Sequence, residues 1–400
     1  MLALTGGNPI RTKVPEKFPW FSGFDSQKLL ELIADSKLSG FLATPSEEHL
    51  GGNYVRQLEN NWNNEFLQAY SVAFNSWTSG LEAAVASCNL PKGSQVITTS
   101  WTMSATVGSI VSNGLVPYFV DISPEDFNMD VDKILDAVNR NTSAILAIDI
   151  FGKPCNADLI KDICDSKSLS FIVDAAQTPK AKIKNKRSVE YSHVGGYSLN
   201  RHKHLQVGEG GVAVTNDSLI AKRMRLYRNH AEVTSETQDE AIPVGHNLRM
   251  GEIEALLAIH QLEKFDHLIE ERRGYGRFLL KNLGQFEWIQ FNVEESFAEH
   301  DFYILPMQLN VEGKALDRDK IVMALKAEGL SEAVGKYGNL HKLTAFRDFP
   351  RQALNNSESL AEESFLGIYL CGYRYTLDQL NEILDMFKKI DDNLEKFMQK

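Results

Sequence analysis

The 400-residue sequence lacks three features, each of which is typical of a common class of proteins. No run of about 18 apolar residues is present, so we expect no membrane-spanning helix. The N-terminus, Met1–Asn8, has neither a charged region nor an adequate apolar region and does not resemble a signal peptide. The formal net charge of −11 argues against a nucleic-acid partner, since phosphate backbones select basic surfaces, and gives no reason for attraction to an anionic membrane.

Two common kinds of site are also missing. The cysteines Cys88, Cys155, Cys164 and Cys371 form no CxxC pair, so we expect no metal site but reduced, mostly buried thiols in a cytoplasmic protein. A dinucleotide-dependent α/β oxidoreductase would need GxGxxG after an early strand, followed about 20 residues later by an acid. No such motif precedes residue 200, and Gly208–Gly211 precedes a strand-like run instead of opening a helix.

The hydrophobic content of 43% and charged content of 24% are typical of a soluble globular protein, here long enough for two domains. Between residues 77 and 215, short apolar runs alternate with helical patterns at 131–138 and 157–166. This alternation predicts an α/β fold with a mostly parallel sheet, whose ligands sit at the carboxyl ends of the strands. The expected strands are Gln95–Thr99, Val116–Ile122, Ala144–Ile150, Ser170–Asp174, Gly195–Ser198 and Val212–Thr215.

A long amphipathic run begins at Gly251 and predicts a helix that links two domains. Beyond it we expect a strand at Phe302–Leu309 and helices at Asp319–Glu328 and Leu377–Met398, which together suggest a smaller C-terminal α+β domain. The predicted division is an N-terminal arm, a large α/β domain and the small domain, at residues 1–25, 26–260 and 261–400.

The most informative segment is Tyr197–Thr215, in which a strand-like stretch ends at Ser198 and Lys203 follows five residues later, before Gly208–Gly211. A lysine on a loop between strands can have its pKa lowered by desolvation and then serve as a Schiff-base nucleophile. A serine at a strand end can bind phosphate. The pattern therefore suggests a covalently held pyridoxal 5′-phosphate (PLP), although a solvated basic loop is the commoner meaning of such a lysine.

Three further segments agree with this interpretation. Phe171–Gln177 places Asp174 at the end of an apolar strand, where a carboxylate can pair with the pyridinium nitrogen of PLP. Asn75–Ala84 places hydroxyl groups before a helical pattern, and a helix N-terminus suits a phosphate dianion. Gly245–Glu252 is a polar turn before the long helix. Each has a purely structural alternative, such as a helix N-cap at Ser76.

Taken in order, and with the aromatic-Thr-x-x-Ala-Thr segment at Trp101–Thr106, these segments resemble the PLP-dependent sugar aminotransferases of the DegT/StrS group over nearly the whole chain. The group lies within the fold type I aspartate aminotransferase superfamily, so the resemblance implies that fold. The opening Gly6–Arg11 also resembles the subgroup that acts on keto-cyclitols and related sugars.

The resemblance implies a role for each matching residue. Lys203 would form the Schiff base and shuttle a proton, Asp174 would pair with the pyridine nitrogen, and Gln177 would lie near the phenolic oxygen. The phosphate would be held by Ser198, by Thr78 and by the backbone around Trp77 and Ser79. Asn247 would reach the phosphate of the neighbouring subunit, which implies a homodimer with shared active sites.

The chain departs from the family pattern in two places. The family usually has Asn/Ser-Gly-Thr where Ser76-Trp77-Thr78 stands, and an indole there could crowd the phosphate. The family usually places an aromatic ring over the cofactor at the position of Met103, to which we assign ring packing instead.

The resemblance implies transamination from L-glutamate or L-glutamine to a keto sugar, free or nucleotide-linked, or to a keto-cyclitol. Some members carry histidine instead of the lysine and act as sugar dehydratases, and His202 and His204 flank the site. Anchoring on Ser198 and on Gly208–Gly211 puts Lys203 at the lysine position and favours transamination. A non-catalytic sensor with this fold stays open. Candidate substrate contacts are Gly51, Gly52, His230, Tyr337 and His341.

Overall fold

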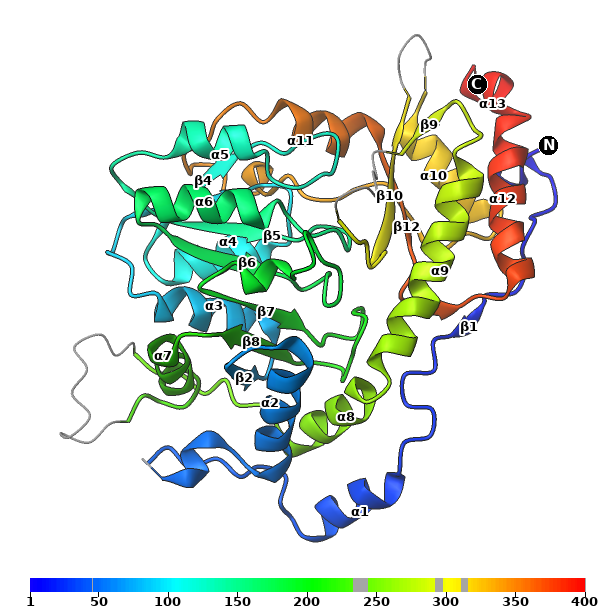
Figure 1. The fold of residues 1–400 in the computed structure, drawn as a ribbon. Helices are drawn as coiled ribbons and strands as arrows, with labels where there is room; N and C mark the ends of the chain where they lie inside the picture. The colour runs from blue at the N-terminus through cyan, green and yellow to red at the C-terminus, as the bar shows by residue number, and fades with distance from the viewer. Residues whose placement is uncertain (45, 233–243, 292–297, 311–315, 400) are drawn as a thin grey trace.

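A computed structural model of the chain describes residues 1–44, 46–232, 244–291, 298–310 and 316–399. Its centre is a seven-stranded sheet in the order β2-β8-β7-β6-β5-β3-β4, in which β8 alone runs against the other strands (Figure 1). The strands are β2 (Tyr70–Phe74), β3 (Gln95–Thr99), β4 (Val116–Val120), β5 (Thr142–Ile148), β6 (Ser170–Asp174), β7 (Val194–Ser198) and β8 (Gly211–Thr215). The expected mostly parallel sheet is confirmed.

The strands of this sheet are almost completely buried, because two groups of helices cover it. One group packs around α3, which contacts α4 and α7, and the other pairs α5 with α6; α2 packs against α8 beside β2. The helices are α2 (Asn53–Phe66), α3 (Trp77–Ser87), α4 (Ser104–Ser112), α5 (Val131–Ala137), α6 (Ala157–Lys167), α7 (Ser218–Arg228) and α8 (Glu252–Leu262).

The run predicted as one linking helix is two helices, α8 and α9 (Phe265–Leu283), separated at Glu263 and Lys264. In Figure 1, α9 runs from the large sheet to a smaller C-terminal domain, where it lies beside α12 (Leu377–Asp391). The predicted final helix also divides, since α13 (Leu394–Met398) follows α12 after a break. Both breaks lie within apolar patterns that continue across them, so periodicity alone does not reveal them.

The small domain holds an antiparallel sheet in the order β11-β12-β10-β9, with its own apolar core. The strand predicted from residue 302 begins at Ile304, because Phe302 has a positive φ of 51°. The elements are β9 (Ile289–Gln290), β10 (Ile304–Leu309), α10 (Arg318–Ala327), β11 (Ala333–Val334), α11 (Asn355–Ser359), β12 (Phe365–Tyr369) and β13 (Tyr373–Arg374).

The N-terminal arm crosses both parts of the molecule. It begins near α10 and α12, pairs β1 (Glu16–Lys17) with β13, and reaches α1 (Ser26–Ala34), which packs against α8 (Figure 1). The residue bounds that we predict for arm, large domain and small domain stay a prediction. Among the described residues, no helix is both long and apolar enough to span a membrane.

Candidate active site

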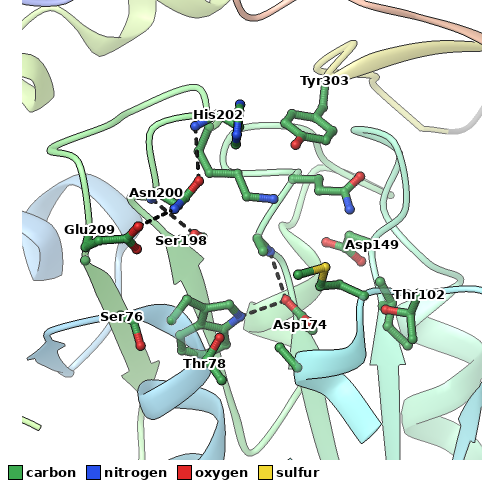
Figure 2. A pocket seen from close by; sticks show the side chains of 18 of the residues that line it. Ser76, Thr78, Thr102, Asp149, Asp174, Ser198, Asn200, His202, Glu209 and Tyr303 are labelled. Atoms are coloured by element: carbon green, nitrogen blue, oxygen red, sulfur yellow. Dashed lines mark hydrogen bonds between the residues drawn. The ribbon is translucent and has the colours of Figure 1, made fainter. Parts of the chain in front are cut away.

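A cavity of about 370 Å³ opens at the carboxyl ends of β5, β6 and β7 and at the N-terminal ends of α3 and α4. Ligands of α/β sheets bind at this edge. Figure 2 shows Ser76 and Thr78 at one end, Tyr303 and His202 at the opposite end, and Asp174 between them. Six of the predicted site residues besides Asp174 also line the cavity, namely Trp77, Thr78, Met103, Gln177, Ser198 and Lys203.

Lys203 lies on the loop that joins β7 to the antiparallel β8. The loop is closed by its own backbone, in which Leu199 donates to Gly210, Arg201 donates to Gly208, and the Lys203 N–H donates to Asn200 at 2.8 Å. The Lys203 Nζ atom lies 4.5 Å from the centroid of the Tyr303 ring, at the start of the small-domain sheet.

Burial lowers the pKa of Lys203 to about 8, even though the charge of Asp174 acts in the opposite direction. A lysine with this pKa is partly unprotonated near neutral pH, and the unprotonated amine is the nucleophilic form. The amine in this cavity is therefore suited to carbonyl chemistry.

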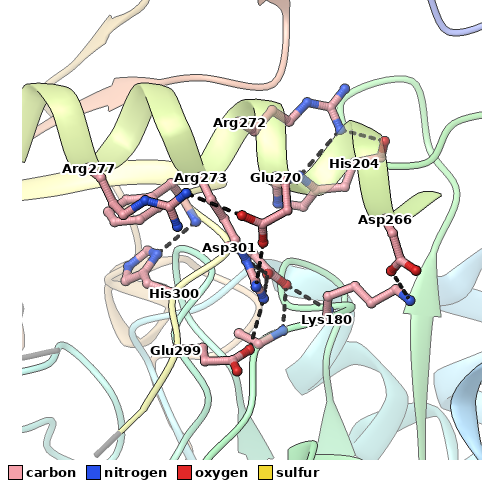
Figure 3. Close-up of polar contacts among 12 residues, drawn as sticks. Lys180, His204, Asp266, Glu270, Arg272, Arg273, Arg277, Glu299, His300 and Asp301 are labelled. Carbon is pink, nitrogen blue, oxygen red and sulfur yellow. Dashed lines mark hydrogen bonds and ion pairs between the residues drawn. The ribbon is translucent and has the colours of Figure 1, made fainter. Parts of the chain in front are cut away.

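The flanking histidines are placed differently from Lys203. His204 is buried, and its carbonyl accepts a 2.6 Å hydrogen bond from Arg272 Nη1 on α9, which Figure 3 shows. Its Nδ1 atom lies 3.4 Å from Cys371 Sγ, and burial lowers the pKa of His204 well below its usual value. His202 lines the cavity at its rim and is exposed. The register that puts Lys203 in the lysine position is consistent with this arrangement.

Both carboxylate oxygens of Asp174 are held by donors. Oδ1 accepts from Trp77 Nε1 at 2.7 Å and from the Ala176 N–H at 3.2 Å, and Oδ2 accepts from Thr106 Oγ1 at 3.0 Å. Because the single hydroxyl hydrogen of Thr106 goes to Asp174, Thr102 must donate the 3.0 Å bond that joins the two threonines.

These contacts show whether Asp174 could also pair with a pyridinium N–H. A carboxylate has about four acceptor positions, of which the three donors use three, so one remains on Oδ2. Asp174 also shares one cavity with Lys203 and with the N-terminus of α3. The donor set fits PLP, which requires an amine, an acid for the ring nitrogen and a phosphate site.

The phosphate end is formed by α3 and by the end of β7. Ser76 is the N-cap of α3, and its Oγ atom accepts the Ser79 N–H at 3.1 Å and lies 2.9 Å from Ser79 Oγ. Ser76, Thr78 and Ser198 line the cavity, whereas Ser79 does not. The N-terminus of an 11-residue helix carries free N–H groups and a positive partial charge, which favour a phosphate.

The indole of Trp77 does not lie in open space at this end. The side chain is 4% exposed and turns inward to Asp174, in a slot bounded by Gly196 and Gly80. A Cβ atom at Gly196 would lie 2.4 Å from the indole ring. The crowding that the sequence suggested at the phosphate end is therefore relieved by burying the ring.

The remaining predicted residues differ in their surroundings. Gln177 Oε1 accepts from the Phe151 N–H at 2.8 Å, and Gln177 Nε2 donates to Tyr337 Oη at 2.9 Å. Met103 is 65% exposed and lines the cavity just before α4, so its thioether is free to cover a ring. Asn247 is exposed and does not line this cavity. The contact predicted for Asn247 is with the phosphate of a second subunit.

Of the suggested substrate contacts, Tyr337 lines the cavity. His341 does not line it, and its Nε2 atom lies 2.8 Å from Glu358 Oε1. His230, Gly51 and Gly52 also lie outside its lining.

Three lining or supporting residues were missed from sequence. Thr106 could have been found, since it ends the aromatic-Thr-x-x-Ala-Thr segment, Trp101–Thr106. Asp149 follows β5 as an acid at a strand end, in the same way as Asp174 at β6. Burial raises the pKa of Asp149 to about 7, and Ser188 donates to its carboxylate. No sequence motif indicates that Tyr303 lines the cavity, because this residue belongs to the small domain. The described residues contain no cluster of three or more side chains able to hold a metal ion.

Comparisons with known proteins bear on the family of the chain. The family model of the DegT/DnrJ/EryC1/StrS aminotransferases matches residues 42–370. GDP-perosamine synthase of Escherichia coli O157:H7 is 27% identical over 64% of this chain and 69% of its own. A putative L-glutamine:3-amino-2,3-dideoxy-scyllo-inosose aminotransferase of Micromonospora echinospora is 25% identical over 91% of this chain and 87% of its own.

The fold has close counterparts among solved structures. DesI, solved in the presence of its TDP-sugar product, superposes with a TM-score of 0.86 at 23% identity, covering 100% of this chain and 98% of its own. The predicted fold type I architecture, with a smaller C-terminal domain, is confirmed.

Proposed function

Because this chain belongs to the DegT/DnrJ/EryC1/StrS aminotransferase family, we propose that it moves an amino group from L-glutamate or L-glutamine to a keto sugar or keto-cyclitol. The acceptor is free or nucleotide-linked. The name of the perosamine synthase relative supports a nucleotide-linked sugar. The name of the Micromonospora relative supports L-glutamine as donor and an inosose as acceptor.

One observation supports the proposal most directly. Lys203, an amine whose pKa burial lowers to about 8, shares a cavity with a carboxylate that keeps one free acceptor position. Bound PLP would supply an electron sink for the electron pair left when a substrate C–H bond breaks. Asp174 would accept a hydrogen bond from its ring nitrogen and so keep that nitrogen protonated.

The other residues bind and orient. The N-terminus of α3, with Thr78 and Ser198, would bind the phosphate, while Met103 would cover one face of the ring. Lys203 would take a proton from the substrate carbon and return it at the cofactor carbon, because its unprotonated amine is a base near neutral pH. Holding these groups in one cavity supplies proximity.

The site would be completed by a second copy of the chain. Asn247 is exposed, and its segment is fixed to the phosphate end because the Asn75 N–H donates to the Leu248 carbonyl at 3.0 Å. Its exposure leaves the Asn247 side chain available to a neighbouring subunit, whose phosphate we propose that it contacts. Light scattering of the purified protein should give the mass of a dimer or of a larger assembly of dimers, and a monomer would contradict the shared site.

A direct test uses the visible absorption of PLP in the purified protein. We expect a yellow band that L-glutamate or L-glutamine bleaches in wild type, and no donor response in Lys203→Ala. Lys184→Ala, on the surface, is the matched control and should behave as wild type. Failure to bind PLP would overturn the proposal. Bound PLP that ignores every amino donor would contradict an aminotransferase and favour the dehydratase or the sensor.

A further inference from the structure

Trp77 differs from the other four tryptophans of the chain in one respect. The indole N–H groups of Trp20, Trp62, Trp101 and Trp288 are buried and have no hydrogen-bond partner among the residues that the structure describes. The indole of Trp77 is also buried, but its N–H donates to Asp174 Oδ1 at 2.7 Å. A donor this close to a carboxylate makes a strong, charge-assisted hydrogen bond.

The indole has little freedom to move away from this carboxylate. A Cβ atom at Gly196 would lie 2.4 Å from the ring atoms Cη2 and Cζ3, and one at Gly80 would lie 2.9 Å from Cε3. A Cβ atom at Gly211 would lie 2.5 Å from the backbone N and Cα of Trp77. Gly196 and Gly80 therefore leave space for the ring, and Gly211 leaves space for the backbone of Trp77, while the indole N–H is directed at Asp174.

The second oxygen of Asp174 is held from the opposite side. Thr106 on α4 donates to Oδ2 and is itself held by Thr102, whereas Trp77 belongs to α3. Donors from two helices thus fix the rotation of the carboxylate. The one acceptor position that remains is on Oδ2.

We propose that Trp77 is a positioning residue for this reaction, which holds Asp174 so that Oδ2 presents its last acceptor position to the pyridine nitrogen. The inference rests on the proposed function, because it gives Asp174 the role of ring-nitrogen partner. It assigns to the Trp77 side chain a task distinct from phosphate binding, which uses the backbone at the N-terminus of α3.

The test is the dissociation constant of PLP in wild type and in four variants of the full-length protein. Trp77→Phe keeps most of the ring volume and removes the N–H. Trp288→Phe is the matched control, since it removes a buried indole that has no partner and lies in the core of the small domain. Asp174→Asn and the double variant with Trp77→Phe complete the cycle.

We expect Trp77→Phe to weaken PLP binding about 2- to 10-fold, because an Asp174 carboxylate that is no longer held must be ordered when PLP binds. Trp288→Phe should leave the constant unchanged. In the Asp174→Asn background the Trp77→Phe change should have little further effect, because a residue that acts through Asp174 cannot act twice. Additive effects in the cycle, or equal effects of the two Trp→Phe changes, would overturn the inference.

A second measurement does not depend on the folding of Trp77→Phe. With ¹⁵N-labelled tryptophan, Asp174→Asn should shift the indole cross-peak of Trp77 in the cofactor-free protein. Single Trp→Phe variants at the other positions assign the peaks by elimination. An unshifted Trp77 peak would refute the hydrogen bond. Wild type that fails to bind PLP would instead refute the proposed function, so the two failures are distinguishable.

Discussion

The titration of Lys203 gives the sharpest quantitative prediction, because its perturbation is simply a change of pH. Burial lowers the pKa of this amine from 10.5 to about 8. At about pH 7, an amine with pKa 8 is roughly 10% unprotonated, whereas one with pKa 10.5 is roughly 0.03% unprotonated. The site therefore raises the reactive form by about 300-fold at neutral pH.

The assay is a pH titration of the cofactor-free protein after reductive methylation with ¹³C-formaldehyde, which gives each lysine its own NMR signal. The signal absent from Lys203→Ala identifies Lys203. Lys184 is the internal control, because its hydrogen bond to Asp158 raises its pKa. We expect the Lys203 signal to titrate near 8 while the Lys184 signal stays unchanged until well above pH 10. A Lys203 midpoint near 10.5 would refute the argument from burial.

Three further predictions concern the support of the site. Gly196→Ala should cost about 1–3 kcal/mol of folding stability, since its methyl group would overlap the adjacent indole. Gly274→Ala, in open space within α9, should instead stabilise the protein by about 0.5–1 kcal/mol. Urea unfolding of the two variants measures both changes in the free energy of unfolding. Arg228→Ala should lower the free energy of unfolding by about 3–5 kcal/mol, because it leaves the Glu59 carboxylate buried without its 2.6 Å ion pair. A loss below about 1 kcal/mol in the same urea assay would contradict this prediction. Burial raises the pKa of Asp149 from 3.8 to about 7, so the folded state binds the proton more tightly than the unfolded state does. Wild-type stability therefore falls as pH rises from about 4 to about 7, and Asp149→Asn should gain about 1 kcal/mol or more relative to wild type across that window. A stability difference that does not change with pH would argue against a titrating carboxyl.

The parallel part of the fold could be predicted because its strands are short apolar runs that end at polar or small residues. The predicted bounds of β3 and β6 agree with the structure. The strand β2, Tyr70–Phe74, was not predicted, since it pairs with β8 about 140 residues away and a five-residue apolar run has no distinctive period. The local sequence of a short apolar run does not predict which distant strand it pairs with.

The sequence predicts only some of the residues that meet in the candidate site. Family motifs place Lys203 and Asp174, which do share the cavity. They do not indicate where the Trp77 side chain points, because that depends on the space left by Gly196 on the neighbouring strand β7. Tyr303 could not be predicted either, since its position depends on how the small domain packs against the large one.

The central claim is that Lys203 is the residue that carries PLP. Borohydride reduction of the protein after incubation with PLP, followed by peptide mass spectrometry, would identify the modified lysine directly. We expect one dominant modification, on the peptide that contains Lys203, and its loss in Lys203→Ala. Modification of a different lysine, or of none, would contradict it.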